Sequence, residues 1–399
     1  MKNLKKFPHQ IGVGGLELSG LEKKLVNQVL DSNQLTYGPM SKEFEQKFAN
    51  SHGCKFGLFM NSGTSALHVA LAALKDRHGW ADGDEVIVPA VTFVATANAV
   101  LHNNMKPIFV DVEKDTYNIN PRLIEEKITS KTRAIIPVHL LGLPADMDPI
   151  LELAKTYRLA VIEDSCETMF ATYKGKSVGS IGDVGCFSTY VAHFLVTGVG
   201  GFAITNNPDL AVDMRSLMNH GRDSIYIASS DDKNLEGEKL YEVVSKRFSF
   251  IHAGHSFRCT ELEAAIGIGQ FNRSQEIIAR RKEIANKFTK ELSVLSDYLQ
   301  LPSVPLDRTH SFMLYGIGVK NESKTKLVRY LEDLNIETRD LLPLINQPIY
   351  KRLYGNMDSK YPIATWVNVS CFYIGCHSYM KDNEVDFIIS ALLNYYNKL

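Results

Sequence analysis

The sequence predicts an α/β fold with a mainly parallel, doubly wound sheet and a smaller C-terminal α+β domain. Before Gly201, short apolar runs alternate with segments of helical periodicity, which is typical of parallel strands joined by helices. Right-handed crossovers between such strands place helices on both faces of the sheet. After Gly201 this alternation changes, and the last part of the chain is dominated by helical patterns around one apolar run.

The expected strands are apolar runs of four to seven residues, and the segments between them have the spacing of apolar residues that helices require. Strands are expected at 55–60, 85–89, 106–112, 133–139, 159–164 and 202–205. Helices are expected at 65–74, 93–102, 122–128, 147–157 and 209–220.

The C-terminal part begins within a long predicted helix that runs from Thr260 to about Leu292, after a polar stretch at 229–237 that predicts an exposed loop. An apolar run at 312–319, a helix at 324–334 and a closing helix at 383–397 follow it. We place the domain boundary inside the long helix. The large domain is then 1–270 and the small domain 271–399, with the N-terminal segment a candidate to pack on the small domain.

Composition excludes several classes of protein. The 399 residues are 45% hydrophobic and 22% charged, as in ordinary globular proteins. The net charge of −1 provides no field that attracts nucleic acid or a membrane surface. No apolar run approaches the ~20 residues of a membrane span, and the start lacks a secretory signal. The six cysteines form no C-x-x-C pair, which argues against a zinc ribbon or a disulfide scaffold. We therefore expect a soluble, cytoplasmic protein.

A short polar loop, 61–65, lies between a predicted strand and an apolar helix. Gly63 permits a tight turn, after which the free N–H groups of the first helical turn and the helix dipole suit a phosphate. Thr64 and Ser65 add hydroxyl groups. The alternative interpretation is an N-capped helix that binds nothing, because serine and threonine are ordinary caps.

Asp164 ends a predicted strand, where open α/β sheets bind their ligands. A carboxylate at that place could keep a heteroaromatic nitrogen protonated, as pyridoxal phosphate (PLP) requires to act as an electron sink. The alternative is that Asp164 caps the next turn. Glu167, three residues later, could reach the same ligand, whereas Glu163 is expected to be structural or solvated.

Taken together, these segments resemble the DegT/DnrJ/EryC1/StrS sugar aminotransferases, which are fold-type-I PLP enzymes. The resemblance covers almost the whole chain, and its motifs follow one another in the order of the family. The segments that carry it are Leu35–Pro39, Asn61–Ser65, Gly83–Pro89, Thr92–Thr96, Pro137–Leu140, Pro144–Asp148, Ile162–Asp164, Gly182–Ser188, Thr197–Gly201, His220–Arg222 and Thr260–Gly267.

The resemblance assigns roles to individual positions. Ser62, Gly63 and Thr64 would cradle the cofactor phosphate, with Ser188 as a further donor. Phe93 would lie against the pyridine ring, where the alternative is an ordinary core aromatic. Asp164 would pair with the pyridine nitrogen, and Glu167 would lie near the phenolic oxygen, where many members have glutamine. Ser256 falls where many members use asparagine to reach the phosphate across a dimer interface, although the surrounding motif is altered here.

One position departs from the family. Its transaminases bind PLP through a lysine five residues after the phosphate-binding serine, and here that residue is His193. No lysine lies between Lys176 and Lys233. Because imidazole forms no stable Schiff base, PLP or its amino form, pyridoxamine phosphate (PMP), is expected to bind non-covalently. His193 can still act as a proton-transfer base, since its unperturbed pKa is about 6.5.

Three functions remain open from these residues. The first is a transaminase that transfers the amino group of L-glutamate to a keto- or aldehyde-sugar. The second is a PMP-dependent sugar 3-dehydratase, since such enzymes resemble this chain in having histidine at position 193 and an acid at position 167. The segments 142–147 and 260–265 look more like those of transaminases, whereas the missing lysine is also consistent with a non-catalytic PLP-binding protein.

The substrate and the assembly are expected from the resemblance alone. The segments 191–201 and 220–226 are similar to a lipopolysaccharide-sugar branch, for which an 8-oxo-3-deoxy-octulosonate is one candidate substrate. Such an acidic sugar would need cations, and Arg222, Arg258 and Arg339 are candidates, although surface ion pairs are the commoner role of arginine. A homodimer with shared active sites is expected. No metal site is expected, because no group of residues has the spacing of metal ligands.

Overall fold

A computed structural model describes residues 4–223, 235–320 and 322–397 of the chain. Its largest sheet has seven strands in the order β1-β9-β8-β5-β4-β2-β3. The joins from β8 to β3 are parallel, and β9 pairs antiparallel with both β8 and β1. The strands are β1 (Phe56–Met60), β2 (Glu85–Pro89), β3 (Lys106–Val110), β4 (Thr132–Ile135), β5 (Ala160–Asp164), β8 (Val184–Ser188) and β9 (Gly201–Thr205).

Helices cover both faces of this sheet. Val86 and Val88 of β2 lie in one buried cluster together with residues of α3 and α4, whereas Ile87 lies in another with residues of α5. Successive strand residues point to opposite faces, so the two clusters are the two sides of the sheet. The helices of this part are α1 (Gly20–Ser32), α2 (Pro39–Ser51), α3 (Gly63–His78), α4 (Val94–His102), α5 (Met147–Tyr157), α6 (Pro208–Leu217) and α8 (Glu261–Asn272).

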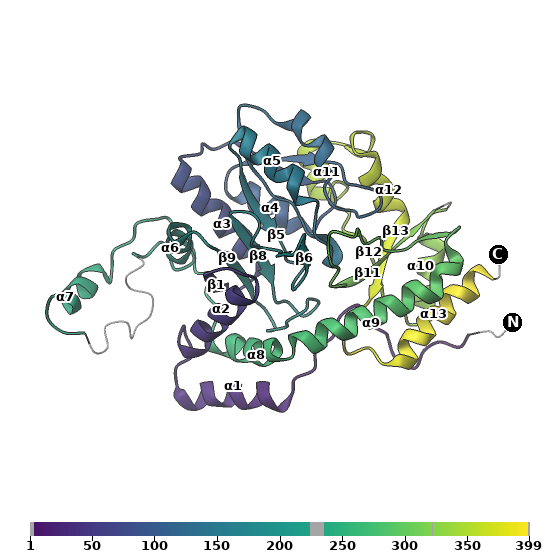
Figure 1. Ribbon diagram of the computed structural model, residues 1–399, viewed down its shortest axis with the longest axis horizontal. Coiled ribbons are helices and arrows are strands. Elements are labelled where there is room, and N and C mark those ends of the chain that lie inside the picture. The colour runs from purple at the N-terminus through teal and green to yellow at the C-terminus, as the bar shows by residue number, and fades with distance from the viewer. Residues whose placement is uncertain (1–3, 224–234, 321, 398–399) are drawn as a thin grey trace.

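A second, four-stranded antiparallel sheet forms the smaller part of the molecule (Figure 1). Its strands, in spatial order, are β10 (Leu299–Gln300), β11 (Leu314–Val319), β13 (Cys371–Gly375) and β12 (Thr338–Asp340). The helices α9 (Ser274–Leu292), α10 (Thr325–Asp333) and α13 (Asp382–Tyr396) contribute apolar residues to the same buried cluster. Near the N-terminus, Ile11 belongs to this cluster and pairs with Ile336. The domain boundary at residue 270 stays a prediction.

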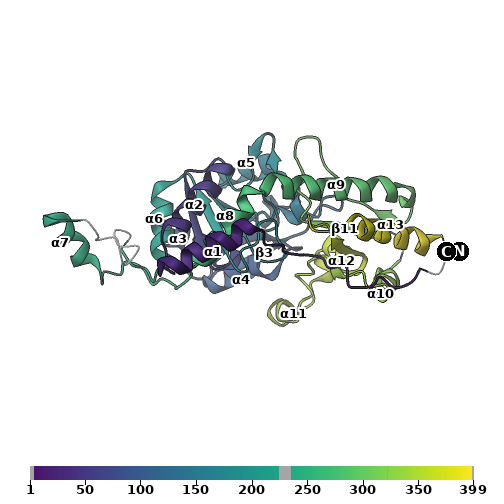
Figure 2. The same cartoon turned by 90° about the horizontal axis from the view of Figure 1, so that it is seen from below.

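The remaining elements are short or stand apart. A two-stranded ribbon joins β6 (Thr172–Tyr173) and β7 (Lys176–Ser177), and α11 (Pro348–Tyr354) and α12 (Pro362–Ser370) precede β13. Figure 2 shows α7 (Gly237–Lys246) at the end of an arm that projects away from both sheets. Most of the predicted exposed loop at 229–237 lies outside the described residues.

Two sequence predictions are wrong in detail. The helix predicted at 122–128 is a pair of 3₁₀ turns, Pro121–Leu123 and Glu125–Lys127, because so short a segment closes i→i+3 bonds without reaching a stable α-helix. The long helix from Thr260 is broken at Arg273 into α8 and α9. Arg273 donates to Glu22 of α1, so α8 remains packed on α1 while α9 extends to the second sheet.

Candidate active site

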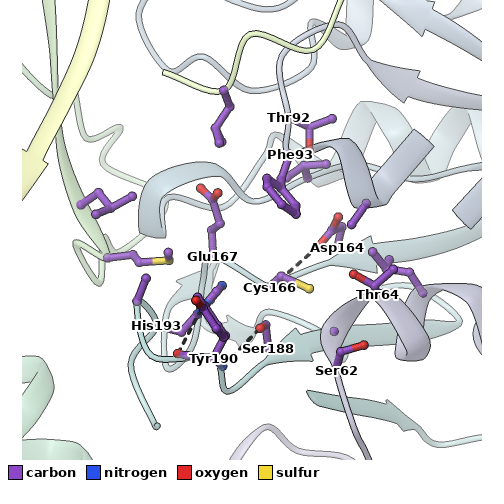
Figure 3. A pocket seen from close by; sticks show the side chains of 18 of the residues that line it. Ser62, Thr64, Thr92, Phe93, Asp164, Cys166, Glu167, Ser188, Tyr190 and His193 are labelled. Atoms are coloured by element: carbon purple, nitrogen blue, oxygen red, sulfur yellow. Dashed lines mark hydrogen bonds between the residues drawn. The ribbon is translucent and has the colours of Figure 1, made fainter. Parts of the chain in front are cut away.

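A cavity of about 430 Å³ opens at the carboxyl ends of β5 and β8, between the large sheet and the second sheet (Figure 3). The predicted residues Ser62, Gly63, Thr64, Phe93, Asp164, Glu167, Ser188 and His193 all line it. From the second sheet and the N-terminal segment come Met313, Leu314, Tyr373 and Val13. The fold therefore brings together residues that are more than 100 positions apart in the sequence.

The predicted phosphate cradle is the N-terminus of the 16-residue helix α3. Ser62 is its N-cap, and the Ser62 hydroxyl oxygen accepts a bond of 3.0 Å from the Ser65 N–H. A Cβ atom on Gly63 would lie 2.7 Å from Cys166 Sγ and 2.9 Å from Ser188 Cβ, so only glycine fits there. Thr64 is exposed to the cavity, and Ser188 ends β8 beside it. The first-turn N–H groups and the positive end of the helix dipole thus face one spot in the cavity.

Asp164 is a buried acid with a built-in set of donors. Its Oδ2 accepts from the Thr96 hydroxyl at 2.7 Å, and its Oδ1 accepts from the Cys166 N–H at 3.2 Å. Thr96 also lies 2.8 Å from the Thr92 hydroxyl, which extends the chain of hydrogen bonds. Burial raises the pKa of Asp164 above its ordinary value, and these donors offset part of that rise. They favour the ionised carboxylate, which is the form that holds a proton on a ring nitrogen.

Glu167 faces the same cavity from the turn after β5. Its Oε2 accepts from the N–H of Leu141 at 2.9 Å, a residue held in the left-handed region at φ 56°. Burial, with a smaller contribution from the neighbouring Asp164 carboxylate, raises the pKa of Glu167 to about 7. Glu167 can therefore donate or accept a proton near neutral pH.

His193 lies half-buried on the loop after β8 and carries the imidazole of the cavity. Its Nδ1 is 3.2 Å from the carbonyl oxygen of Tyr190. A carbonyl oxygen only accepts, so this bond requires the proton on Nδ1 and leaves the lone pair on Nε2. Burial, together with the charge of Arg281, lowers the pKa of His193 to about 4. The imidazole is therefore neutral at pH 7 and can accept a proton.

No lysine lines the cavity within the ranges that the structure describes. His193, which the sequence resemblance places at the position of the family's lysine, is on the wall of this cavity. A ring-bearing cofactor in this cavity has Phe93 beside it, which is 57% exposed at the N-terminal end of α4. The cradle at Gly63, the carboxylate of Asp164, the ring of Phe93 and the imidazole of His193 together fit PLP or PMP held without a covalent bond.

The other predicted ligand residues do not line the cavity of the single chain. Ser256 is exposed, and its hydroxyl accepts from Arg258 at 3.2 Å. Arg258 also contacts His220, and Arg222 donates to the carbonyl oxygen of Arg247. Arg339 lies in β12, an edge strand of the second sheet, in an ion pair with Glu337. Their roles toward substrate, and that of Ser256 across a dimer interface, stay predictions.

Glu163 has a structural role, which is one of the two roles, structural or solvated, that the sequence predicts for it. It is fully buried and accepts from His139 and from the N–H groups of Gly179, Ile181 and Gly182, at 2.7–2.9 Å. These bonds fix the turn between β7 and β8. Asp164, the next residue, points to the opposite face of the strand and into the cavity.

Sequence reasoning missed several residues of the site. Thr96 lies in the segment Thr92–Thr96, and its helical spacing from Thr92 is the signal that the two hydroxyls lie together. Tyr373 and Val13 carry no such signal, because they reach the cavity from the second sheet and from the N-terminal segment. In the ranges that the structure covers, no group of three or more His, Cys, Asp or Glu side chains is arranged to hold a metal ion. No described helix is long and apolar enough to cross a membrane.

Comparisons with known proteins agree with this geometry. Residues 17–393 match the DegT/DnrJ/EryC1/StrS aminotransferase family. The GDP-perosamine synthase of Caulobacter vibrioides is 34% identical over 388 residues, which are 96% of this chain and 97% of that protein. The crystal structure of an aminotransferase from Psychrobacter cryohalolentis is 29% identical, with a TM-score of 0.85 over 96% of this chain and 98% of that one.

A dehydratase is equally similar in structure. The Escherichia coli GDP-4-keto-6-deoxy-D-mannose-3-dehydratase with bound hydrated PLP has a TM-score of 0.86 and 26% identity, over 96% of this chain and all of that one. The predicted fold-type-I class and the predicted cofactor, PLP or PMP, are confirmed by these matches. The extent of the family match and of the identity leaves one conclusion: the chain belongs to the DegT/DnrJ/EryC1/StrS aminotransferase family.

Proposed function

We propose that this protein is a sugar aminotransferase that moves the amino group of L-glutamate to a keto- or aldehyde-sugar, with His193 as its proton-transfer base. The observation that carries the proposal is the neutral imidazole of His193 on the wall of the cavity that also holds Asp164 and the Gly63 cradle. This arrangement supplies a base, an acid partner for a ring nitrogen and a phosphate site in one cavity.

Each of these groups has a separate task. Bound PLP or PMP supplies an electron sink for the carbon next to the reacting nitrogen. The N–H groups at the start of α3 hold the phosphate, and the Asp164 carboxylate holds a proton on the ring nitrogen. Nε2 of His193 accepts the proton from the α-carbon of glutamate, while the Tyr190 carbonyl keeps the other ring nitrogen protonated.

A second candidate function is a PMP-dependent sugar 3-dehydratase. It is favoured by His193 in place of the lysine, by the acid Glu167 in the same cavity and by the similarity to the Escherichia coli dehydratase. Both functions begin with the same conversion of PLP and glutamate to PMP and 2-oxoglutarate. They differ in whether nitrogen stays on the sugar or is released as ammonia while a hydroxyl group is lost.

The finer features of the proposal follow the sequence resemblance. We propose that the product enters lipopolysaccharide or another surface glycan, with an 8-oxo-3-deoxy-octulosonate as one candidate substrate and Arg222, Arg258 and Arg339 as its candidate cations. We also propose a cytoplasmic homodimer in which Ser256 of each chain contributes to the site of the other.

The experiment that tests the proposal follows nitrogen. Purified protein is incubated with PLP and ¹⁵N-glutamate, and a panel of oxo-sugars is then added, with products identified by mass spectrometry. A ¹⁵N-labelled amino-sugar supports the aminotransferase, and labelled ammonia with a deoxygenated sugar supports the dehydratase. Failure to form PMP in the first step contradicts both functions and leaves a non-catalytic PLP-binding protein.

A further inference from the structure

A buried arginine connects the loop of His193 to the second sheet. Arg281, on α9, is 2% exposed. Its Nη2 donates to the carbonyl oxygen of His193 at 3.0 Å, and its Nη1 donates to those of Met313 at 2.7 Å and Cys376 at 3.1 Å. Its guanidinium carbon lies 4.9 Å from the ring centre of Phe194, the next residue of the loop.

Within the described parts of the chain, the guanidinium of Arg281 contacts carbonyl oxygens and no carboxylate. All of its acceptors are main-chain carbonyl oxygens. Burial lowers the pKa of Arg281 to about 10, so the side chain still carries its charge at neutral pH. Burying a cation without a carboxylate partner costs folding free energy. Arg281 therefore does not stabilise the fold through an ion pair.

We propose that Arg281 is a positioning residue for His193, because its guanidinium fixes the loop that carries the imidazole and places a positive charge beside it. The inference rests on the proposed function, in which His193 is the base. Four segments meet at this one side chain: α9 provides it, the residues just before β11 and just after β13 accept from it, and the loop after β8 is held by it.

The charge of Arg281 matters because the acidic groups of the cavity shift the pKa of His193 in the opposite direction. The carboxyl groups of Asp164 and Glu167 line the same cavity, and when ionised they favour a protonated imidazole. The remaining titratable groups near His193 are Cys166, Tyr190 and Tyr373 in the cavity wall, and the charge of Arg281 also acts on His377. The positive charge of Arg281 opposes protonation of His193 and so adds to the larger effect of burial.

The test compares Arg281→Met and Arg281→Lys with Arg280→Met. Arg280 is the neighbouring residue on α9 and forms exposed ion pairs with Glu283 and Asp382, so it controls for the loss of an arginine from this helix.

Histidine labelled with ¹³C at Cε1 is titrated by NMR in the cofactor-free protein, and the His193 signal is identified by its loss in His193→Gln. We expect Arg281→Met to raise the titration midpoint of His193 by about one pH unit, because the protonated imidazole is no longer repelled by a nearby positive charge. Arg281→Lys keeps the charge and Arg280→Met leaves it untouched, so both are expected to retain the wild-type midpoint.

Hydrogen exchange of the loop peptide that contains His193 provides a second measurement. Arg281→Lys loses the planar fork that spans several carbonyl oxygens, and we expect exchange of this peptide to be about tenfold faster, whereas Arg280→Met leaves it unchanged. This measurement keeps the inference testable if Arg281→Met fails to fold. A wild-type midpoint in Arg281→Met, or wild-type exchange in Arg281→Lys, overturns the inference.

These measurements do not depend on turnover. If the wild-type protein fails to convert PLP and glutamate, the proposed function fails, while the titration still shows whether Arg281 controls the imidazole. If the wild-type protein does convert them and Arg281→Met shows an unshifted midpoint, the inference alone fails.

Discussion

The Thr96 hydroxyl donates to Asp164 Oδ2 over 2.7 Å, although the two residues lie on different elements and 68 positions apart. Because Thr96 donates its proton to the carboxylate, it accepts from Thr92, 2.8 Å away. The acid that faces the cavity is thus supported from behind by a helix, α4, whose N-terminal end carries Phe93. The same helix therefore sets two of the predicted cofactor contacts.

We expect Thr96→Val to weaken binding of PLP by about tenfold, because one charge-assisted hydrogen bond to an ionised group contributes about 1.5–3 kcal/mol. Its loss raises the pKa of Asp164 and so disfavours the carboxylate that pairs with the ring nitrogen. Fluorescence titration with PLP measures the affinity. Thr92→Val removes only the outer member of the chain, and its effect is expected to be smaller; an equal loss in both variants contradicts this order.

We expect His193→Ala to reduce the conversion of PLP and glutamate to PMP by about 10²–10⁴-fold, the usual contribution of a positioned base. Cofactor affinity stays within a few fold, since the phosphate cradle and Asp164 are unchanged. Single-turnover absorbance of the cofactor measures the rate. His78→Ala, which removes an exposed imidazole stacked on Trp80 of the large domain, serves as the control and retains the wild-type rate. An unreduced rate in His193→Ala removes this residue from its role.

The same conversion is expected to depend on pH in a way that identifies its base. A pKa of about 4 keeps His193 neutral above pH 5, so raising the pH further does not create more base. In the Glu167→Gln variant, which removes the carboxyl group with a pKa of about 7, the rate should be flat from pH 6 to 8 and fall only on the acid side. Stopped-flow measurements across this range check it. An inflection near pH 6.5, the ordinary value for histidine, contradicts the buried and neutral imidazole.

Glu167 also predicts a pH dependence of stability. Its pKa rises from 4.5 in the unfolded chain to about 7 in the folded one, so folded protein binds more protons and loses stability as pH rises from about 4.5 to 7. We expect Glu167→Gln to be more stable than wild type by up to about 3 kcal/mol at pH 8 and equal to it at pH 4.5.

Urea denaturation at both pH values measures this difference. Glu152→Gln, on the exposed side of α5, is the matched control, and its stability should differ little from that of wild type at either pH. A Glu167→Gln variant that is equally stabilised at both pH values points to packing rather than to the buried charge.

Gly63→Ala is expected to abolish PLP binding and to destabilise the fold by about 1–3 kcal/mol, because the added Cβ would lie 2.7 Å from Cys166 Sγ. Equilibrium dialysis and urea denaturation measure the two effects. Gly20→Ala, at the start of α1 with no atom within 4 Å of the added Cβ, is expected to bind PLP as wild type does. Retained binding in Gly63→Ala shows that the cradle is not the phosphate site.

The sequence by itself determined the strands and helices whose signals are local. The apolar run of β2 and the helical periodicity of α5 predicted those elements to the residue, because side-chain burial repeats every 2 or 3.6 residues. The loop at Gly63, the acid at the end of β5 and the histidine at position 193 were also visible, since each stands at a fixed offset from a strand.

Only the tertiary structure decided what surrounds these residues. The break at Arg273, the donation from Thr96 to Asp164 and the buried position of Arg281 depend on contacts between distant segments, which leave no periodic trace in the sequence. The protonation states also depend on the tertiary structure. Removal from water raises the pKa of Glu167 and lowers that of His193, so it favours the neutral form of both side chains. Burial is a property of the assembled molecule.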